Sequence, residues 1–555
     1  MLPPIFKNAT SPRLFLLISL FFVFTFFSPY HPKLNNPNEG VRIYMVKALI
    51  DNGHFHINKV VKKWGYVDDK SKKDNKLYSS KAPLMSMFGA AAYGTYRLFG
   101  DAMAEKELTT LCRFWANALP AFLLLLALGW YLEQYFRNKS ATDFTLINLA
   151  VGTHLLAYVH IFSGHTIAAL CTGLIVLNLL YQGSDKSLFW HSAIVGGSAT
   201  LAVGAEYPAF LSVVPLGLGF IIQKRDALKR VLLGGLCGAL PFALLAGYAH
   251  HKMFGNFWTT GYSFLENKSY NKLHSQDFFG IGAPKTEVLQ SVLFSFDIGL
   301  VFFTPFVLLG AWCLLTWWRS SFQRTQALFI SLALLGMFLF IAGHRGWRGG
   351  WVVGPRYISE VTAILVILGG IWLHEKGCFN RKSQPWLWAA ISLSVIGVLH
   401  SGVASAFFPH LSETYQNPVY EMMLPMALRG FSPDTWLLHW GASSNQSAFV
   451  GLCLLFLPLL IWIHSHTHIK RSTAIFTMIT TLCLAFGLGP LLPGSKKSTI
   501  GLETRHLYRN WSPDEGRPFK HPKDTVNFKA QTLIEPTAKT FKAINRMCKK
   551  TGEHK

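Results

Sequence analysis

The chain has 555 residues, of which 51% are hydrophobic and 14% are charged, and its formal net charge is +24. Soluble proteins carry nearly twice this share of charged residues, so the composition excludes an ordinary soluble globular domain. The positive charge is spread over short links between apolar runs and over segments beyond them, which favours anionic lipid headgroups or lipid phosphates over nucleic acid. We therefore expect membrane lipids as partners and no nucleic acid.

Long apolar runs separated by basic links predict an all-α, polytopic membrane protein of about thirteen transmembrane helices. Lys and Arg gather in the links after every second run, which places those links and the N-terminus in the cytoplasm. No small-residue cleavage site follows the first run, so that run is predicted to be a retained helix. The predicted spans cover residues 13–30, 114–136, 143–161, 165–181, two crossings within 189–222, then 231–250, 298–317, 327–342, 357–374, 386–400, 449–463 and 474–492.

This topology places three segments on the outer side, at about residues 31–113, 252–297 and 343–356. In the first segment, two helices are expected to lie in or dip into the outer interface: 40–52, ending at Gly53, and 84–98. Residues 494–555 would also lie outside, with 14 Lys and Arg against 6 Asp and Glu. This basic tail either rests on a membrane surface or only solubilises the chain.

The first outer segment contains two residues that could take part in a reaction. Glu39 is the first carboxylate after the first span and could accept a proton from a hydroxyl. Helix capping by Asn38, with Glu39 at the positive end of the helix dipole, explains the same pair without any reaction. Lys81, just before Pro83, could meet a lipid phosphate, or it could be an ordinary interfacial anchor.

The third outer segment has Arg345, Arg348 and Arg356 among Gly and Trp residues. Guanidinium groups fit phosphate oxygens, Gly lets the backbone approach a ligand, and Trp offers a stacking face for a sugar. A set of interfacial anchors would not need the glycines. The segment therefore predicts a phosphate and sugar site.

The order of short motifs along the chain resembles the bacterial C-type membrane glycosyltransferases, which have the GT-C fold. These are relatives of the polyprenol-phosphate-sugar-dependent protein mannosyltransferases and of the lipid A aminoarabinose transferase. The resemblance covers roughly residues 10 to 375, so 1–375 is predicted to be the catalytic module and 376–493 a set of additional helices. The motifs are Asn38-Glu39, Tyr78 to Pro83, Ser163-Gly164-His165, Glu206-Tyr207-Pro208, Phe254-Gly255, Gly261-Tyr262, Gly299-Leu300, Thr304-Pro305 and Gly354 to Tyr357.

The resemblance implies transfer of a monosaccharide from a polyprenyl-phosphate donor to an envelope acceptor, which could be protein, lipid A or a cell-surface glycan. The reaction would take place on the outer face of the inner (plasma) membrane, with Glu39 as base in an inverting displacement. Asp69 is the reserve base, because the family commonly shows an Asp-Glu pair where this chain has Asn38-Glu39. No cofactor or metal site is expected, although a divalent metal is left open.

By the same resemblance, four cations would bind the donor phosphate: Lys81, Arg345, Arg348 and Arg356. Seven further residues are expected to line the substrate pocket: Tyr78, His165, Glu206, Tyr262, His344, Trp351 and Tyr357.

Two other classes of protein stay open. A flippase or transporter of lipid-linked sugars could share the basic outer segments, and such proteins often have internal repeats, broken helices and polar groups at mid-membrane. The sequence has few mid-membrane charges and no clear repeat, which favours a transferase. A glycan ligase or polymerase would differ in its donor, an assembled chain rather than a monosaccharide.

Overall fold

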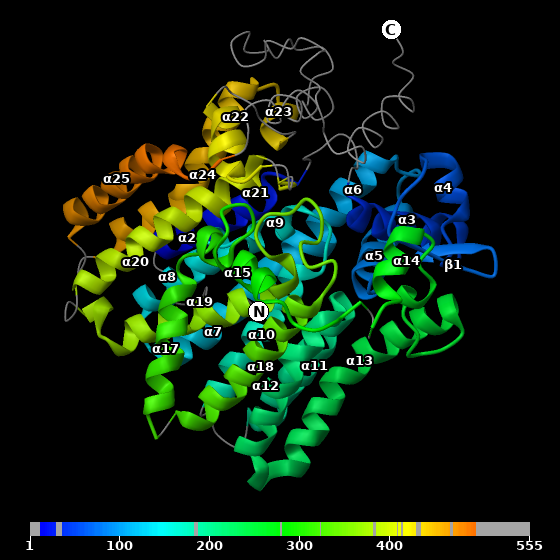
Figure 1. Cartoon of the computed structure of the whole chain (residues 1–555), viewed down its shortest axis with the longest axis horizontal. Coiled ribbons are helices and arrows are strands. Elements are labelled where there is room, and N and C mark those ends of the chain that lie inside the picture. Colours follow the sequence, from blue (N-terminus) through cyan, green and yellow to red (C-terminus); the bar gives the residue numbers. More distant parts are fainter. Residues whose placement is uncertain are drawn as a thin grey trace.

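The computed structural model describes residues 11–28, 36–181, 187–277, 280–321, 323–380, 384–407, 409–411, 415–428, 435–466 and 470–494. This part of the chain is mainly helical and contains one short antiparallel hairpin, so the predicted all-α class is confirmed. Figure 1 shows the helices packed side by side in one body. The predicted basic tail lies outside the described residues, apart from Gly494.

The first outer segment contains most of the non-spanning elements. Its elements are α3 (Pro37–Asn52), α4 (Asn58–Trp64), β1 (Lys70–Lys73), β2 (Lys76–Ser79), α5 (Leu84–Arg97) and α6 (Glu105–Arg113). The second outer segment adds η5 (Gly261–Phe264), α14 (Lys268–His274) and α15 (Thr286–Phe294). In Figure 1, α4, β1 and α14 lie together at the right of the body.

The remaining helices form the apolar body. Before the second outer segment they are α2 (Ser11–Thr25), η1 (Phe114–Ala118), α7 (Leu119–Phe136), α8 (Lys139–Val151), α9 (Leu155–His160), α10 (His165–Leu180), α11 (Leu188–Ala205), η3 (Tyr207–Ala209), α12 (Phe210–Gln223), η4 (Arg225–Ala227) and α13 (Leu228–Phe254). After it they are α16 (Leu300–Phe303), α17 (Val307–Arg319), α18 (Arg324–Gly343), η6 (Arg356–Ile358), α19 (Ser359–Glu375), η7 (Cys378–Asn380), α20 (Gln384–Gly397), η8 (Val398–Gly402), α21 (Val403–Phe407), η9 (Val419–Met423), α22 (Leu424–Leu428), α23 (Trp436–His439), α24 (Ser444–Ser465), α25 (Arg471–Leu488) and η10 (Gly489–Leu491).

Eight helical stretches among the described residues are long and apolar enough to cross a membrane, and three shorter apolar helices accompany them. The eight are Glu105–Phe136, Leu188–Ala205, Arg225–Phe254, Arg324–Gly343, Arg356–Asn380, Gln384–Phe407, Ser444–Ser465 and Arg471–Leu491, and the shorter three are Pro12–Thr25, His165–Leu180 and Tyr207–Gln223. These eleven stretches coincide with eleven of the predicted spans. They agree with a multi-pass membrane protein.

The other two predicted spans, 143–161 and 298–317, are not continuous helices. The first is broken between α8 and α9, and the second between α16 and α17, where Pro305 cannot donate the backbone hydrogen bond that would continue a helix. The two breaks meet, because the Thr304 hydroxyl accepts a hydrogen bond of 3.4 Å from the His154 backbone N–H. The apolar pattern of both runs predicts continuous spans, so the breaks are not visible in it.

Helices α10 and α19 form the centre of the body. Every residue of α10 is buried, as are the first fifteen residues of α19, from Ser359 to Leu373. The two helices pack against each other, α10 also against α7 and α11, and α19 also against α8 and α17. A helix that is apolar on all sides can be buried in a core or cross a membrane, and both helices are apolar enough to take this central position.

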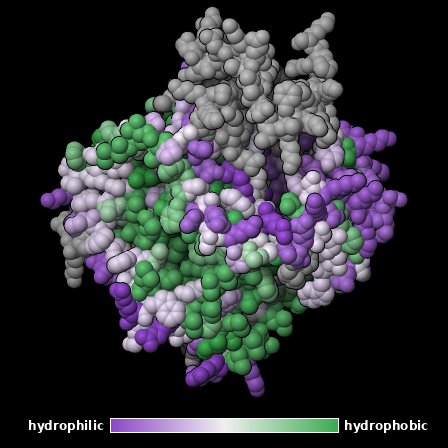
Figure 2. Space-filling view, in the orientation of Figure 1, coloured by the Kyte–Doolittle hydropathy of each residue, from purple (hydrophilic) through white to green (hydrophobic). Residues whose placement is uncertain are grey.

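Helix α13 is apolar but lies at the edge of the body. Its backbone approaches α11 closely, because a Cβ atom at Gly196 would lie 2.0 Å from the carbonyl oxygen of Gly235. The opposite side of α13 exposes leucines such as Leu232, Leu236 and Leu240. Figure 2 shows hydrophobic residues gathered over the lower and central part of this face, with hydrophilic residues to the right, over α4, β1 and α14. The body and the outer segments thus differ sharply in polarity.

Candidate active site

The three segments that are predicted to lie outside are joined to one another by backbone hydrogen bonds. Ser71 in β1 forms an isolated bridge with Leu265 of the second segment, and Ile281 forms another with His344 of the third. The Arg345 N–H also donates to the carbonyl of Gly280 at 2.9 Å. These contacts hold side chains from three distant stretches of sequence around one place.

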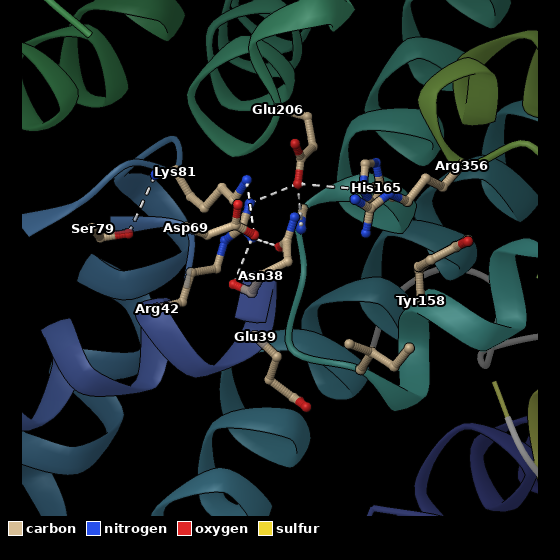
Figure 3. Close-up of polar contacts among 12 residues, drawn as sticks. Asn38, Glu39, Arg42, Asp69, Ser79, Lys81, Tyr158, His165, Glu206 and Arg356 are labelled. Carbon is tan, nitrogen blue, oxygen red and sulfur yellow. Dashed lines mark hydrogen bonds and ion pairs between the residues drawn. The ribbon is translucent and has the colours of Figure 1, made fainter. Parts of the chain in front are cut away.

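A cluster of buried charges lies at this junction, and Figure 3 shows its members directed toward one another. The Lys81 ammonium lies 3.2 Å from a carboxylate oxygen of Asp69. A second ion pair joins Arg42 and Glu206 at 2.7 Å. With Arg356, which is also buried, the cluster contains three cations against two carboxylates. It therefore has an excess of positive charge.

The pKa values of Glu206 and Lys81 are shifted by the neighbouring charged groups of the cluster. Burial alone would raise the pKa of Glu206, yet the surrounding positive groups, including Arg42, Lys81 and Arg356, lower it below its usual range. Burial would lower the pKa of Lys81, but Asp69 beside it raises the pKa instead. Both groups are charged at neutral pH.

Asp69 adopts a left-handed backbone conformation, with φ of 58°. Asp tolerates this region better than most residues, but it is uncommon for any residue with a side chain and recurs at functional sites. The Asp69 carbonyl accepts hydrogen bonds from the backbone N–H and the hydroxyl of Ser80, which fixes the turn before β1. The Asp69 side chain is 17% exposed, so its carboxylate remains accessible from the surface.

Arg356 carries a buried Nε atom with no hydrogen-bond partner among the described residues. Its terminal nitrogen donates to the Tyr357 hydroxyl at 3.3 Å, and its guanidinium lies 5.0 Å from the centre of the Tyr357 ring. A buried donor without a partner is costly, and an anionic ligand would satisfy it. Arg356 is thus a cation available for a phosphate.

Close contacts explain why two positions of the third segment are glycines. A Cβ atom at Gly349 would lie 2.7 Å from Arg356 Nε, and the backbone there has a φ of 75°, which side chains disfavour. At Gly354, with φ of 62°, a Cβ atom would lie 2.7 Å from the His154 side chain. The glycines let the segment pass close to the guanidinium.

We expect Gly349→Ala to move Arg356 out of the cluster. The cost of the clash and of the backbone conformation is about 1–3 kcal/mol in total. The measurement is binding of polyprenyl phosphate to the purified variant in lipid nanodiscs, which should be weakened. Gly350→Ala is the control, because Gly350 has a similar φ of 84° but open space around its Cβ position. Equal weakening in both variants would contradict the steric explanation.

Glu39 lies outside the cluster. Its two carboxylate oxygens accept hydrogen bonds of 2.6 Å from Nε and a terminal nitrogen of Arg113, and one of them also accepts the Phe162 backbone N–H at 2.7 Å. The Glu39 side chain is 1% exposed, and Figure 3 shows it pointing away from the other charged groups. In this geometry Glu39 fastens α3 to α6 and to the turn before α10.

The predicted N-cap of the first outer helix is wrong by two residues. Asn36 caps α3, accepting hydrogen bonds from the backbone N–H groups of Asn38 and Glu39. The side chain of Asn38 instead accepts a hydrogen bond from Arg42, one turn further along α3. The predicted end of this helix at Gly53 is confirmed.

Three of the four predicted phosphate cations have carboxylate partners, and two of these three, Arg345 and Arg348, pair outside the charged cluster. Arg345 pairs with Asp277 at 2.7 Å, with both side chains more than 40% exposed, and Arg348 pairs with Asp297. These ion pairs connect the third outer segment to the second. The phosphate role of both arginines stays a prediction, and Lys81 and Arg356 are the two that the fold brings into the cluster.

Most of the predicted pocket residues surround the cluster. Tyr262 lies over the Lys81 ammonium, and His165 approaches Glu206 at 3.8 Å. The rings of Tyr357 and His344 contact each other, with centres 5.4 Å apart. Burial and the neighbouring His274 lower the pKa of His344 to about 4, so it is neutral at neutral pH. These rings form an aromatic wall beside the charges.

Two predicted pocket residues lie elsewhere. Tyr78 packs against Phe254 in a separate apolar cluster between α3 and α13. Trp351 packs against the main apolar core. Neither has a described contact with the charged groups.

Sequence reasoning missed Arg42, which is fully buried and holds Glu206 in place. The sequence could have indicated this residue, because an Arg within the apolar run from Val41 to Met45 needs a partner when the helix is buried. The identity of that partner, 164 residues away, depends on the fold.

Comparison with known proteins gives similar solved structures, two of which are described below. No protein-family model and no curated protein sequence matches the chain. The structure of ArnT from Cupriavidus metallidurans bound to undecaprenyl phosphate is similar over 87% of this chain and 80% of ArnT, with 17% identity and a TM-score of 0.44. The archaeal oligosaccharyltransferase AglB from Archaeoglobus fulgidus, in complex with an inhibitory peptide and a dolichol-phosphate, is similar over 80% of this chain and 59% of AglB, with 11% identity and a TM-score of 0.45.

Proposed function

We propose that this protein is a GT-C membrane glycosyltransferase that moves a monosaccharide from a polyprenyl-phosphate carrier to an envelope acceptor on the outer face of the membrane. The observation that carries the proposal is the cluster of the buried cations Lys81 and Arg356 with the partly exposed Asp69, between polar segments and apolar helices. A lipid-phosphate donor needs both environments, cations for its phosphate and an apolar body for its chain.

Lys81 and Arg356 would bind the donor phosphate. Arg356 has an unsatisfied buried donor within the described part of the chain, and Lys81 can shift from Asp69 toward an incoming anion. The phosphate leaves as an anion when the bond to the sugar breaks, so fixed positive charge beside it stabilises the transition state.

Asp69 would be the base, in place of Glu39. In the proposed step the acceptor oxygen forms a bond to the anomeric carbon of the sugar. The bond between that carbon and the phosphate oxygen breaks, and its electron pair goes to the phosphate. Asp69 takes the proton of the acceptor hydroxyl. A single displacement of this kind inverts the configuration of the sugar. Asp69 is accessible and lies beside the phosphate cation, whereas three hydrogen bonds occupy the Glu39 carboxylate.

A flippase is the second candidate, favoured by the broken helices that meet at Thr304 and His154. Cleavage of the donor distinguishes a glycosyltransferase from a flippase. Purified protein in nanodiscs is incubated with a panel of polyprenyl-phosphate monosaccharides and membrane extract, and mass spectrometry measures the free polyprenyl phosphate. Transfer predicts its release, whereas a flippase moves the donor without releasing it.

In the same assay, we expect Lys81→Ala to reduce the rate of release by about one hundredfold, because one stabilising contact to the leaving phosphate is lost. The matched control is Lys73→Ala, whose ammonium binds the Phe254 carbonyl at 2.8 Å in the same outer layer, away from the charged cluster. An unchanged rate in Lys81→Ala would remove this residue from the donor site.

A further inference from the structure

A strongly basic surface covers the outer segments next to the charged cluster. Five exposed lysines come from the first segment: Lys59, Lys62, Lys63, Lys72 and Lys76. Lys268 and Lys272, on α14 of the second segment, extend this surface. None of the seven makes an ion pair with another residue that the structure describes.

The elements that carry these lysines are fastened to one another. The side chain of Asn58, at the start of α4, accepts a hydrogen bond from the Leu77 backbone N–H of β2 at 2.9 Å. The side chain of Asn267, which caps α14, donates to Asp68 at 3.1 Å. Figure 2 shows hydrophilic residues over this area. The lysines therefore belong to one fixed surface, which we name the lysine surface.

Two carboxylates of this surface are neutralised within the protein. Glu266 pairs with Lys70 at 2.9 Å, and Asp277 pairs with Arg345. Asp68 accepts hydrogen bonds from the neutral groups of Tyr66 and Asn267 and keeps its charge. With the exposed Asp74, at the tip of the hairpin, this gives two negative charges beside the seven lysines. The lysine surface thus keeps a large positive excess directed at solvent.

A shallow, open cavity of about 320 Å³ lies within this surface. Its lining combines two ammonium groups with an amide, a hydroxyl, one carboxylate and one apolar residue: Lys268, Lys272, Asn271, Ser275, Glu266 and Leu265. The Asn271 amide nitrogen donates to the Leu265 carbonyl at 3.0 Å, and the two ammonium groups can bind an anionic group of a sugar.

The cavity is connected to the charged cluster by α14. The ring of His274, at the end of α14, lies 4.9 Å from the ring of Tyr262, which in turn covers Lys81. Asp68, which binds the α14 cap, directly precedes Asp69 in the chain. A molecule bound in the cavity would have its next sugars at the edge of the aromatic wall.

We infer that the acceptor is an anionic glycan, bearing carboxylate or phosphate groups, which binds the lysine surface with one acidic sugar in the α14 cavity. This inference rests on the proposed function, because it names the acceptor class for the same site. Acidic groups along the glycan would pair with the lysines, while the hydroxyl that receives the sugar reaches Asp69.

The test uses the full-length protein in nanodiscs of uncharged lipid and two fluorescent probes, a short alginate oligosaccharide and a neutral dextran of equal length. We expect alginate to bind, with an affinity that falls as salt rises, and dextran to bind far more weakly. Lys268→Gln with Lys272→Gln should weaken alginate binding by about tenfold. The control double variant, Lys229→Gln with Lys376→Gln, alters exposed lysines in the first turn of α13 and just after α19, and it should bind normally.

Several outcomes would overturn the inference. Equal binding of alginate and dextran, or equal weakening in both double variants, would show that the lysine surface does not select an anionic glycan. Loss of binding to phosphatidylglycerol vesicles in Lys268→Gln/Lys272→Gln, with alginate binding unchanged, would assign the surface to a membrane instead. Donor cleavage is measured separately, so expected alginate binding without any donor cleavage would reject the transferase and leave the glycan surface standing.

Discussion

Asp69→Asn should abolish most sugar transfer, with a loss of about one hundred- to ten thousandfold in rate, while the protein stays folded and still binds polyprenyl phosphate. The amide keeps the shape of the carboxylate but cannot accept the acceptor proton. The replacement leaves the buried Lys81 ammonium without this counter-charge, so some stability is lost, but Asn also tolerates the left-handed backbone at this position and the fold is kept. The measurement combines the rate of polyprenyl-phosphate release with the thermal unfolding temperature in nanodiscs.

A matched control for this variant is Asp74→Asn. Asp74 also has a left-handed backbone, with φ of 49°, and lies in the turn of the same hairpin, but it is exposed and remote from Lys81. Transfer at the normal rate by Asp69→Asn would remove this carboxylate from the mechanism. A similar loss in Asp74→Asn would attribute the effect to the hairpin rather than to the base.

Glu39→Gln should lower the stability of the protein more than its rate of sugar transfer. The substitution removes the Glu39 charge from the buried Arg113 guanidinium, and breaking a buried pair in this way costs about 3–5 kcal/mol. The measurement is the unfolding temperature of the variant, which should fall by several degrees or more. The fraction that stays folded should retain a substantial rate of transfer, because Glu39 lies away from the cluster.

The double variant Glu39→Gln/Arg113→Gln provides the internal control for that result. Removing both charges should restore part of the lost stability, since the buried guanidinium that lost the Glu39 charge is removed as well. A variant Glu39→Gln of normal stability that has lost transfer would instead identify Glu39 as the base, as the family resemblance implied.

The sequence predicted the positions of most helices and of the turns at His165 and Glu206, because apolar length and basic links report these directly. It could not predict how charges pair. Glu39 meets an Arg 74 residues away and Arg42 meets Glu206 across 164 residues, and such partners depend on packing. Hence the resemblance indicated Glu39 as the main carboxylate, while the geometry favours its reserve, Asp69.

The broken helices show a second limit of the sequence pattern. The run 143–161 is apolar enough to predict one span, yet the chain breaks between α8 and α9 so that His154 can pack against Gly354 beside the charged cluster. Hydropathy measures the average of a run and does not report a local break. The glycine at 354 was visible in the sequence, but its neighbour was not.

The most direct test is a cryo-electron microscopy structure of the protein in nanodiscs with polyprenyl phosphate. The proposal predicts phosphate density within hydrogen-bond distance of both Lys81 and Arg356, with the Lys81 ammonium shifted from Asp69 and the lipid chain leading into the apolar body. Phosphate density at Arg345 or Arg348, with the Lys81–Asp69 pair intact and Arg356 free of ligand, would contradict it.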